Sequence, residues 1–266
     1  MKKYLSFFRI RFIAGLQYRA AAWGGISTQF AWGFMRILMF LAFYESGQER
    51  FPMTFPQLTS YIWLQQAFLA LFGCSFDNDI FDSITTGSIA YELCRPCDLY
   101  YMWFTKDMAT RISRALLRCV PILLVAAFLP HPFNIDTPQT PAVFFLFLLS
   151  SVLGVLVLNA FTMLIYMTAF YTVASRGVRS LTMSVIEFLG GGIIPLPFFP
   201  ESLRLLAVAL PFASVQNTPF LIYVGHISGS EVALNLAVQG TWLLALLFIG
   251  RIMIGKSLRR VVVQGG

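Results

Sequence analysis

Residues 142–175, AVFFLFLLSSVLGVLVLNAFTMLIYMTAFYTVAS, contain no Asp, Glu, Lys, Arg or His. A helix needs about 20 apolar residues to cross the hydrocarbon core of a bilayer, so this stretch is longer than one crossing requires. It predicts a membrane-spanning helix that tilts or that projects beyond the membrane.

The whole chain has the composition of a membrane protein. Of its 266 residues, 58% are hydrophobic and 12% are charged, whereas soluble domains carry about 25% charged residues. Too little polar surface is left to face water, so we expect most of the outer surface to face lipid. The length allows one membrane domain, residues 1–266, with short loops and no separate folded module.

Other apolar stretches complete the prediction of an all-α, polytopic protein with six transmembrane helices. The predicted spans are residues 21–44, 57–76, 111–129, 142–175, 181–195 and 232–250. Before the first span, Leu5, Phe8, Phe12 and Leu16 share one helical face, which predicts an N-terminal interfacial helix on the inner leaflet.

The positions of the basic residues predict the orientation. With the N-terminus inside, all but three of the 19 Lys and Arg residues lie in predicted cytoplasmic segments; the exceptions are Arg36, Arg50 and Arg204. The positive-inside rule then places both termini in the cytoplasm of a multi-pass protein of the inner or plasma membrane. The net charge of +7 follows this topology, and since no basic stripe is interleaved with aromatic residues, nucleic acid is not an expected partner.

Two motifs that can indicate enzymatic or metal chemistry lack the context they need. Cys94 and Cys97 form a C-x-x-C, but no βαβ pattern and no further pair of zinc ligands accompanies them. Residues 250–257, GRIMIGKS, match the P-loop pattern, which binds phosphate only as a loop between a strand and a helix. Here the pattern follows a predicted span, so we interpret Gly250 and Gly255 as helix-end residues and predict no ATPase activity and no cofactor.

Two ionisable residues, Arg36 and Glu187, lie within predicted spans, where such side chains are costly and often functional. Their predicted depths differ, because Arg36 lies near the outer half of span one and Glu187 near the inner end of span five. A direct pair is therefore not expected. Arg36 either snorkels outward or meets a polar partner, and Glu187 is predicted to line a cavity or an inner gate.

Arg111, Arg114 and Arg118 recur every three to four residues and share one helical face. Asp107 can support Arg111 at the i,i+4 spacing. This row is expected to contact either anionic lipid head groups or a cytoplasmic partner.

The loop between spans two and three, residues 77–106, is the longest on the predicted cytoplasmic side. From Ile84 to Pro96 it contains ITTGSIAYELCRP. Ile84, Ile89 and Leu93 predict an interfacial helix that presents them to a partner and that ends at Pro96. The alternative is a solvated connector.

A second informative stretch, GGGIIPLPFFP, runs from Gly190 to Pro200. Three glycines followed by prolines cannot continue a regular helix, so span five is predicted to break near the outer leaflet. Broken backbone at membrane depth must pack in protein or line a cavity. Residues 201–227 are apolar but interrupted, which predicts short re-entrant or interfacial helices on the outer side.

These two stretches resemble the permease subunit of ATP-binding-cassette transporters of the type-2 exporter class. In that family a cytoplasmic coupling helix has the pattern I-x-x-G-x-I-x-x-x-L-x-R-P, matched from Ile84 to Pro96. A glycine-rich fifth span runs into P-x-x-x-F-P and then L-P-F, matched from Gly190 to Phe212. The N-terminal interfacial helix and the six spans are also typical of it.

The resemblance implies a division of labour between subunits. A separate cytoplasmic ATPase would dock on the coupling segment, and two permease chains, identical or related, would enclose the pathway. The residues implied in coupling are Ile84, Gly87, Ile89, Leu93, Arg95 and Pro96. The gate or pathway residues are Glu187, from its position in a span, and Gly190, Gly191, Gly192, Pro195 and Pro197. Nothing in the sequence selects a substrate.

Three other classes remain as alternatives. A secondary transporter or channel often carries an inverted repeat with matching broken helices, but only the second half of this chain shows an obvious break. A membrane-embedded enzyme would need convergent His, Asp, Glu or Ser residues at motif spacing, which the spans lack. A structural scaffold is the third alternative.

Overall fold

The computed structural model describes residues 2–17, 19–47, 51–172 and 175–259, and within them all regular structure is helical. The α-helices before the loop of residues 129–140 are α1 Lys2–Leu16, α2 Arg19–Glu45, α3 Phe55–Ala67, α4 Leu69–Phe72, α5 Asn78–Thr85, α6 Ile89–Leu93 and α7 Leu99–Phe128. Those after it are α8 Pro141–Thr168, α9 Ser175–Leu189, α10 Glu201–Ala209, α11 Asn217–Tyr223 and α12 Ser230–Leu258, with a 3-10 turn, η1, at Leu196–Phe198.

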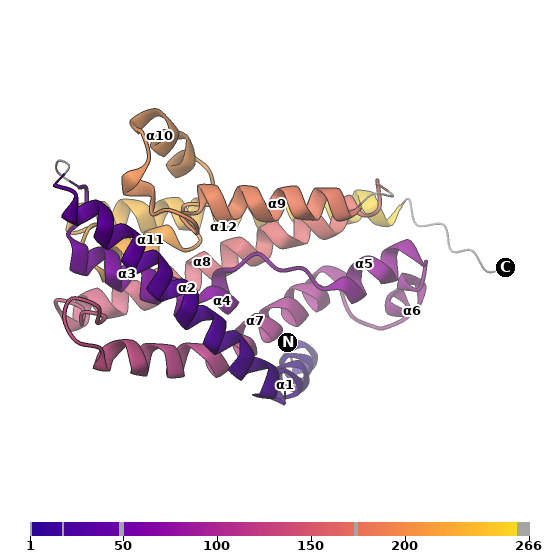
Figure 1. Ribbon diagram of the computed structural model, residues 1–266. Helices are drawn as coiled ribbons and strands as arrows, with labels where there is room; N and C mark the ends of the chain where they lie inside the picture. The colour runs from indigo at the N-terminus through magenta and orange to yellow at the C-terminus, as the bar shows by residue number, and fades with distance from the viewer. Residues whose placement is uncertain (1, 18, 48–50, 173–174, 260–266) are drawn as a thin grey trace.

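The long helices run between two ends of the molecule (Figure 1). One end carries α5, α6 and the last turns of α12. The opposite end carries α10 and the loops that join α2 to α3 and α7 to α8. Helix α12 packs along α8, and α1 packs along α7.

Three described helices are long and apolar enough to cross a membrane: residues 22–45 of α2, α8 and α12. The predicted all-α membrane protein is therefore confirmed, whereas the six-span topology stays a prediction. The predicted third span, residues 111–129, corresponds to the second half of the longer helix α7, which begins at Leu99 and also carries Lys106 and Asp107. The predicted fifth span corresponds to α9, which has 15 residues.

The prediction of one continuous helix over 57–76 is wrong. Helix α3 starts at a capping box, in which the side chain of Thr54 and that of Gln57 each accept from the other residue's backbone N–H, but it ends at Ala67. One short turn, α4, follows, and the chain is extended at Gly73 (φ −61°, ψ 134°). A side chain from α7, described below, binds the carbonyl groups of Gly73 and Ser75 in this extended segment.

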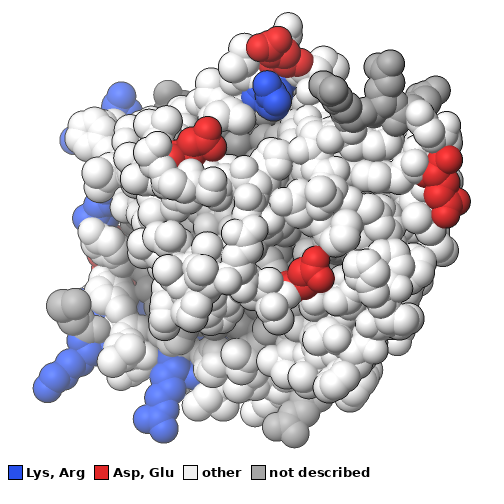
Figure 2. Space-filling model, turned by 90° about the vertical axis from the view of Figure 1, so that its left-hand side faces the viewer, with Lys and Arg blue, Asp and Glu red and all other residues white. Residues whose placement is uncertain are grey.

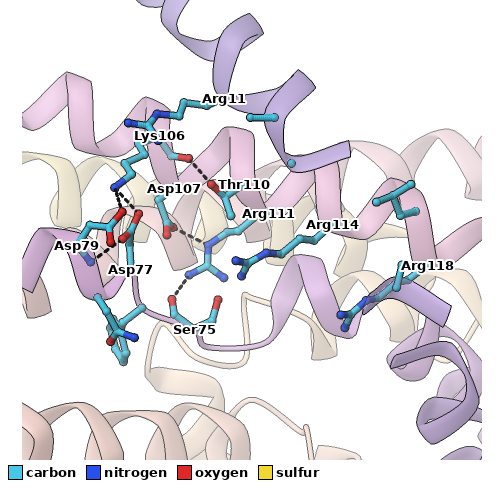
Figure 3. Close-up of a pocket in the computed structure, with 16 residues that line it drawn as sticks. Arg11, Ser75, Asp77, Asp79, Lys106, Asp107, Thr110, Arg111, Arg114 and Arg118 are labelled. Carbon is cyan, nitrogen blue, oxygen red and sulfur yellow. Dashed lines mark hydrogen bonds and ion pairs between the residues drawn. The ribbon is translucent and has the colours of Figure 1, made fainter. Parts of the chain in front are cut away.

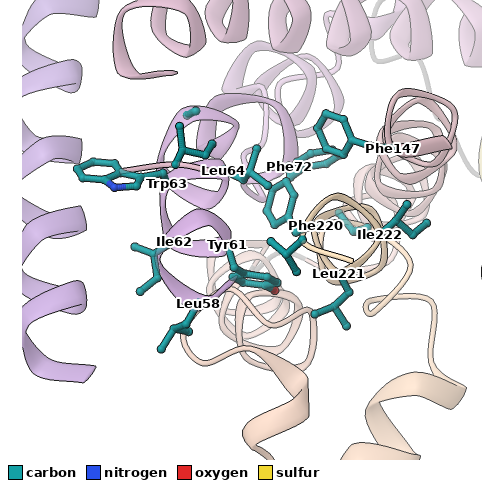
Figure 4. Packing of buried hydrophobic residues seen from close by; sticks show 14 of the residues in the cluster. Leu58, Tyr61, Ile62, Trp63, Leu64, Phe72, Phe147, Phe220, Leu221 and Ile222 are labelled. Atoms are coloured by element: carbon teal, nitrogen blue, oxygen red, sulfur yellow. The ribbon is translucent and has the colours of Figure 1, made fainter. Parts of the chain in front are cut away.

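The centre of the protein is filled by α3 and α11. From Leu58 to Ala67 every residue is buried, and so are all but the last residue of α11. Figure 4 shows Tyr61, Phe72, Phe147 and Phe220 packed between these helices and α8. The rings of Phe72 and Phe220 meet edge-on, with centroids 5.5 Å apart.

The end that carries α10 presents a mostly uncharged surface (Figure 2). The outer faces of the long helices also expose many large apolar residues, such as Trp23, Leu38, Leu149, Leu244 and Phe248. Apolar flanks of this kind are expected where a helical bundle faces lipid.

Candidate functional site

The predicted break after span five is present, and it is buried. Helix α9 ends at Leu189, and Gly190, Gly191 and Gly192 follow in a turn shielded from solvent. Gly191 has φ +76°, which side-chain-bearing residues rarely adopt. A β-carbon on Gly191 would also lie only 2.8 Å from the hydroxyl oxygen of Tyr61. Conformation and space both require glycine here.

The carbonyl groups freed by the break accept hydrogen bonds from α2 and α3. Arg36 Nη1 donates to Gly192 O at 2.9 Å, and Gln65 Nε2 donates to Gly191 O and Gly192 O at 3.0 and 2.6 Å. Arg36 Nη1 also donates to Gln65 Oε1. Arg36 therefore meets polar partners inside the protein rather than snorkelling outward, as one of the two sequence interpretations predicted.

A second set of bonds secures the far side of the break. The Asn217 Oδ1 atom accepts from the backbone N–H of Leu196 at 3.3 Å and lies 3.1 Å from the Tyr61 hydroxyl. Pro195 and Pro197 are buried beside it. The predicted gate residues from Gly190 to Pro197 are thus buried in one segment that is hydrogen-bonded to α3 and α11.

A cavity of about 620 Å³, which we call the central cavity, lies between α2, the α3–α4 segment and α9. It borders the break, because Gly192 and Gln216 are among its walls. Its charged walls are Arg36, Arg114, Arg118 and Glu187.

Glu187 lies farther from the start of its helix than predicted. Helix α9 begins at Ser175, so Glu187 lies near its last turn, just before the break, and shares the central cavity with Arg36. Among the described side chains no ion pair joins the two. The absence of a direct pair agrees with the prediction, and both side chains line this cavity. The gate role of Glu187 stays a prediction.

A neighbouring cavity of about 560 Å³, the basal cavity, lies between α1, α7 and the segment that leads into α5. Ser75, Arg114 and Arg118 line both cavities. Figure 3 shows the row of Arg111, Arg114 and Arg118 along α7, with Asp77 and Asp79 opposite Lys106. Lys106 Nζ lies 2.7 Å from Asp77 Oδ2 and 3.2 Å from Asp79 Oδ2.

Arg111 holds the unwound segment between α4 and α5. Its Nε donates to Asp107 Oδ2 at 2.6 Å, and its two terminal nitrogens donate to Gly73 O and Ser75 O at 2.8 and 2.9 Å. The expected i,i+4 pair is confirmed. However, Arg111 is only 2% exposed, so the prediction that it contacts lipid or a partner is wrong for this member of the row.

The same network reaches α8. The Tyr166 hydroxyl lies 3.4 Å from Asp107 Oδ1 and accepts from the backbone N–H of Asp77 at 2.7 Å. Helices α7 and α8 are thereby connected to the residue that caps α5, because the Asp77 side chain accepts from Asp79 N.

The predicted coupling segment forms two short helices rather than one. Gly87 lies between α5 and α6 with φ +77°, and α6 ends at Leu93, before Pro96. Ile89 is 1% exposed and packs with Ile80 and Phe81. The prediction that Ile89 points to a partner is therefore wrong, because this side chain anchors the segment to its own core, and Ile84 is also partly buried there.

The exposed surface of this segment comes from other residues. Leu93 is exposed, as its predicted orientation requires, Arg95 and Pro96 are also exposed, and Tyr91 is 78% exposed. Sequence reasoning missed Tyr91. Tyr91 is two positions from Ile89, hence on the opposite side of a helix, but this spacing indicates exposure only once Ile89 is known to be buried.

The P-loop-like residues 250–257 lie within helix α12, so their backbone N–H groups do not form a phosphate-binding loop. The helix continues to Leu258, and Gly250 is consequently not a helix-end residue. It instead allows close packing, because a β-carbon there would lie 2.7 Å from the hydroxyl oxygen of buried Tyr100. Cys94 and Cys97 are free thiols.

The two glycines of this pattern give a matched test. Gly250→Ala is expected to destabilise the protein by about 1–3 kcal/mol through overpacking against Tyr100. Gly255→Ala, with nothing within 4 Å, is expected to be neutral or stabilising by about 1 kcal/mol, since alanine favours a helix. Unfolding temperatures in neutral detergent distinguish the two. Equal losses would contradict the packing role of Gly250.

A buried helix break that borders a polar cavity in an apolar helical bundle is typical of membrane transport proteins. A family model described as "ABC-2 family transporter protein" matches residues 30–265. The chain therefore belongs to the ABC-2 transporter family, as its sequence motifs suggested, and it is a membrane transport component. A search of curated proteins gave no match.

Proposed function

We propose that this chain is the membrane-spanning permease subunit of an ATP-driven exporter and works with a separate cytoplasmic ATPase. In this proposal residues 1–266 form one transmembrane domain with six spans, and two permease chains, identical or related, enclose the pathway. The observation that carries the proposal is the central cavity, which supplies polar walls beside a helix break in a member of the ABC-2 family.

The proposed orientation places α5, α6 and both termini in the cytoplasm. Most basic residues lie in the segments assigned to that side, whereas the end with α10 is mostly uncharged (Figure 2). Helix α1 would then lie on the inner leaflet, and α10 and α11 would be the short helices of the outer side.

The proposed coupling route starts at the exposed face of α6 and the neighbouring residues Arg95 and Pro96. A displacement of α5 and α6 reaches α7 and α8 through the bonds of Asp77, Tyr166, Asp107 and Arg111. The extended segment at Gly73 and Ser75, bound to Arg111, leads directly into α4 and α3. Helix α3 in turn binds the glycine break through Tyr61 and Gln65, so the proposed ATPase site and the proposed gate are linked.

Co-purification tests the proposal. A nucleotide-binding subunit is expected to accompany the full chain in mild detergent, and the reconstituted complex, but not the chain alone, is expected to hydrolyse ATP. Solute movement by the isolated chain down an ion gradient would instead favour a secondary transporter or channel.

Variants of the α6 surface test where the ATPase docks. Tyr91→Ala and Leu93→Ala are each expected to weaken association by about tenfold or more, because exposed aromatic and aliphatic anchors dominate interface energies. Leu205→Ala, on exposed α10 at the opposite end, is the control. Retention of the ATPase, measured on an affinity column, should fall only for the α6 variants. A similar loss with Leu205→Ala would refute the assignment.

A further inference from the structure

Two arginines where the cavities meet have no ion-pair partner among the described residues. Arg111 pairs with Asp107, and Lys106 pairs with the aspartates before and within α5. Within the part of the chain that the structure describes, no hydrogen bond or ion pair engages Arg114 or Arg118, and both line the central and the basal cavity. The charged walls of the central cavity, three arginines and Glu187, therefore carry a net positive charge, which attracts anions.

The wall of α2 is shaped to receive one of these arginines. A β-carbon on Gly25 would lie 2.8 Å from Arg118 Cζ and 3.0 Å from Arg118 Nη2. The absence of a side chain at Gly25 lets the guanidinium group of Arg118 lie directly against the helix. This group is thus seated at the cavity wall rather than extended into solvent.

Gln29 lies one turn beyond Gly25 on the same face of α2 and also lines the central cavity. Its side chain is 3% exposed, yet neither Nε2 nor Oε1 has a hydrogen-bond partner. Buried amides are nearly always hydrogen-bonded, so an unsatisfied one needs an explanation. A ligand in the cavity that accepts from Nε2 supplies it.

The same cavity also has an apolar rim. Trp32, Leu69 and Met183 line it while remaining 55%, 39% and 40% exposed. A cavity that combines cationic and amide groups with exposed apolar side chains matches a ligand that has both a polar head and an apolar tail.

We propose that the central cavity binds the anionic head group of a membrane amphiphile. Arg114, Arg118 and Gln29 bind its phosphate or carboxylate, and Trp32 and Met183 contact its apolar part. Guanidinium groups bind such oxyanions through charge-assisted hydrogen bonds. The inference relies on the proposed function only for the further step of treating this amphiphile as cargo.

Binding to the purified full chain in neutral detergent tests the site without any ATPase. The probes are oleoyl lysophosphatidic acid and oleoyl lysophosphatidylcholine, which share one tail and differ in head-group charge. The anionic probe is expected to bind about tenfold or more tightly, as the loss of one charge-assisted bond would predict. Equal affinities would overturn the proposal, and so would equally tight binding of inorganic phosphate, because the apolar part would then contribute nothing.

Variants locate the binding. The double variant R114Q/R118Q should lose about tenfold or more in affinity for the anionic probe. The control R9Q/R176Q, which removes the same charge at exposed positions outside both cavities, should retain it. Gln29→Leu should weaken binding without lowering the unfolding temperature, because no bond to the protein is lost. Unchanged binding in both cavity variants would overturn the proposal.

A final experiment distinguishes a transported ligand from a resident lipid. In liposomes that contain the permease with its co-purified ATPase, ATP-dependent movement of fluorescent lysophosphatidic acid between leaflets supports a role as cargo. Binding without movement supports a resident anionic lipid. Failure of the proposed function would remove the ATP-dependent movement and leave the binding data intact.

Discussion

Arg111→Met is expected to destabilise the protein by about 3–5 kcal/mol, because it leaves the Asp107 carboxylate buried without its partner. Arg111 and Asp107 are 2% and 5% exposed. The substitution also leaves the carbonyl groups of Gly73 and Ser75 without the donors that bind them at 2.8 and 2.9 Å. Methionine fills a similar volume, so the loss reports charge and hydrogen bonding rather than a cavity.

Denaturant unfolding in neutral detergent measures this effect, and Arg114→Met is its control. Arg114 lies three residues further along α7 and is exposed, and its replacement is expected to change stability by less than about 0.5 kcal/mol. The double variant R111M/D107L should recover part of the loss, since it removes both buried charges. Equal effects of Arg111→Met and Arg114→Met would contradict the network. Hydrogen exchange at residues 73–77 should also accelerate only in Arg111→Met.

This network explains why one predicted span was wrong. From Gln57 to Phe76 the sequence has no charged residue, and no glycine or proline follows Pro56 until Gly73. Nothing local therefore marks the end of α3 at Ala67. After the short turn α4, the extended chain from Gly73 is stabilised by Arg111, a residue 38 positions away from Gly73. Such long-range partners leave no periodic signal.

The break after α9 shows the opposite case. Three glycines and two prolines in sequence determine locally that a helix must end, and the helix does end at Leu189. Its partners could not be predicted, because Tyr61, Gln65 and Arg36 belong to other helices. Their spacing carried a partial signal, since Tyr61 and Gln65 are one turn apart and so share a face of α3.

The α5–α6 segment lies between these cases. The composition predicted where this segment lies, and Gly87 lies at its bend. The predicted orientation of Ile89, however, was wrong. In a segment this short, the sequence pattern is the same whether Ile89 is buried in the protein's own core or faces a partner. The choice depends on whether Ile80 and Phe81 lie behind it, and the folded chain places them there.

Gly191→Val is expected to cost about 2–5 kcal/mol, the combination of about 1–2 kcal/mol for a left-handed backbone and about 1–3 kcal/mol for overpacking. The new β-carbon would lie 2.8 Å from the Tyr61 hydroxyl oxygen and 3.0 Å from Asn217 Oδ1. Both atoms belong to the bonds that secure the break, so the substitution should also disturb the walls of the central cavity.

Gly177→Val is the matched control for Gly191→Val, because Gly177 lies in α9 with nothing within 4 Å of its β-carbon position. Valine there is expected to be neutral or slightly stabilising in thermal unfolding. Adding Tyr61→Phe to Gly191→Val removes the nearest clashing atom but not the backbone strain, so it should restore only part of the loss. Full restoration would show that contact with the Tyr61 hydroxyl alone requires glycine. No restoration would assign the requirement to the backbone together with the remaining contact at Asn217. A Gly191→Val protein as stable as Gly177→Val would mean that the break does not need its left-handed residue, and the proposed gate would lose its structural basis.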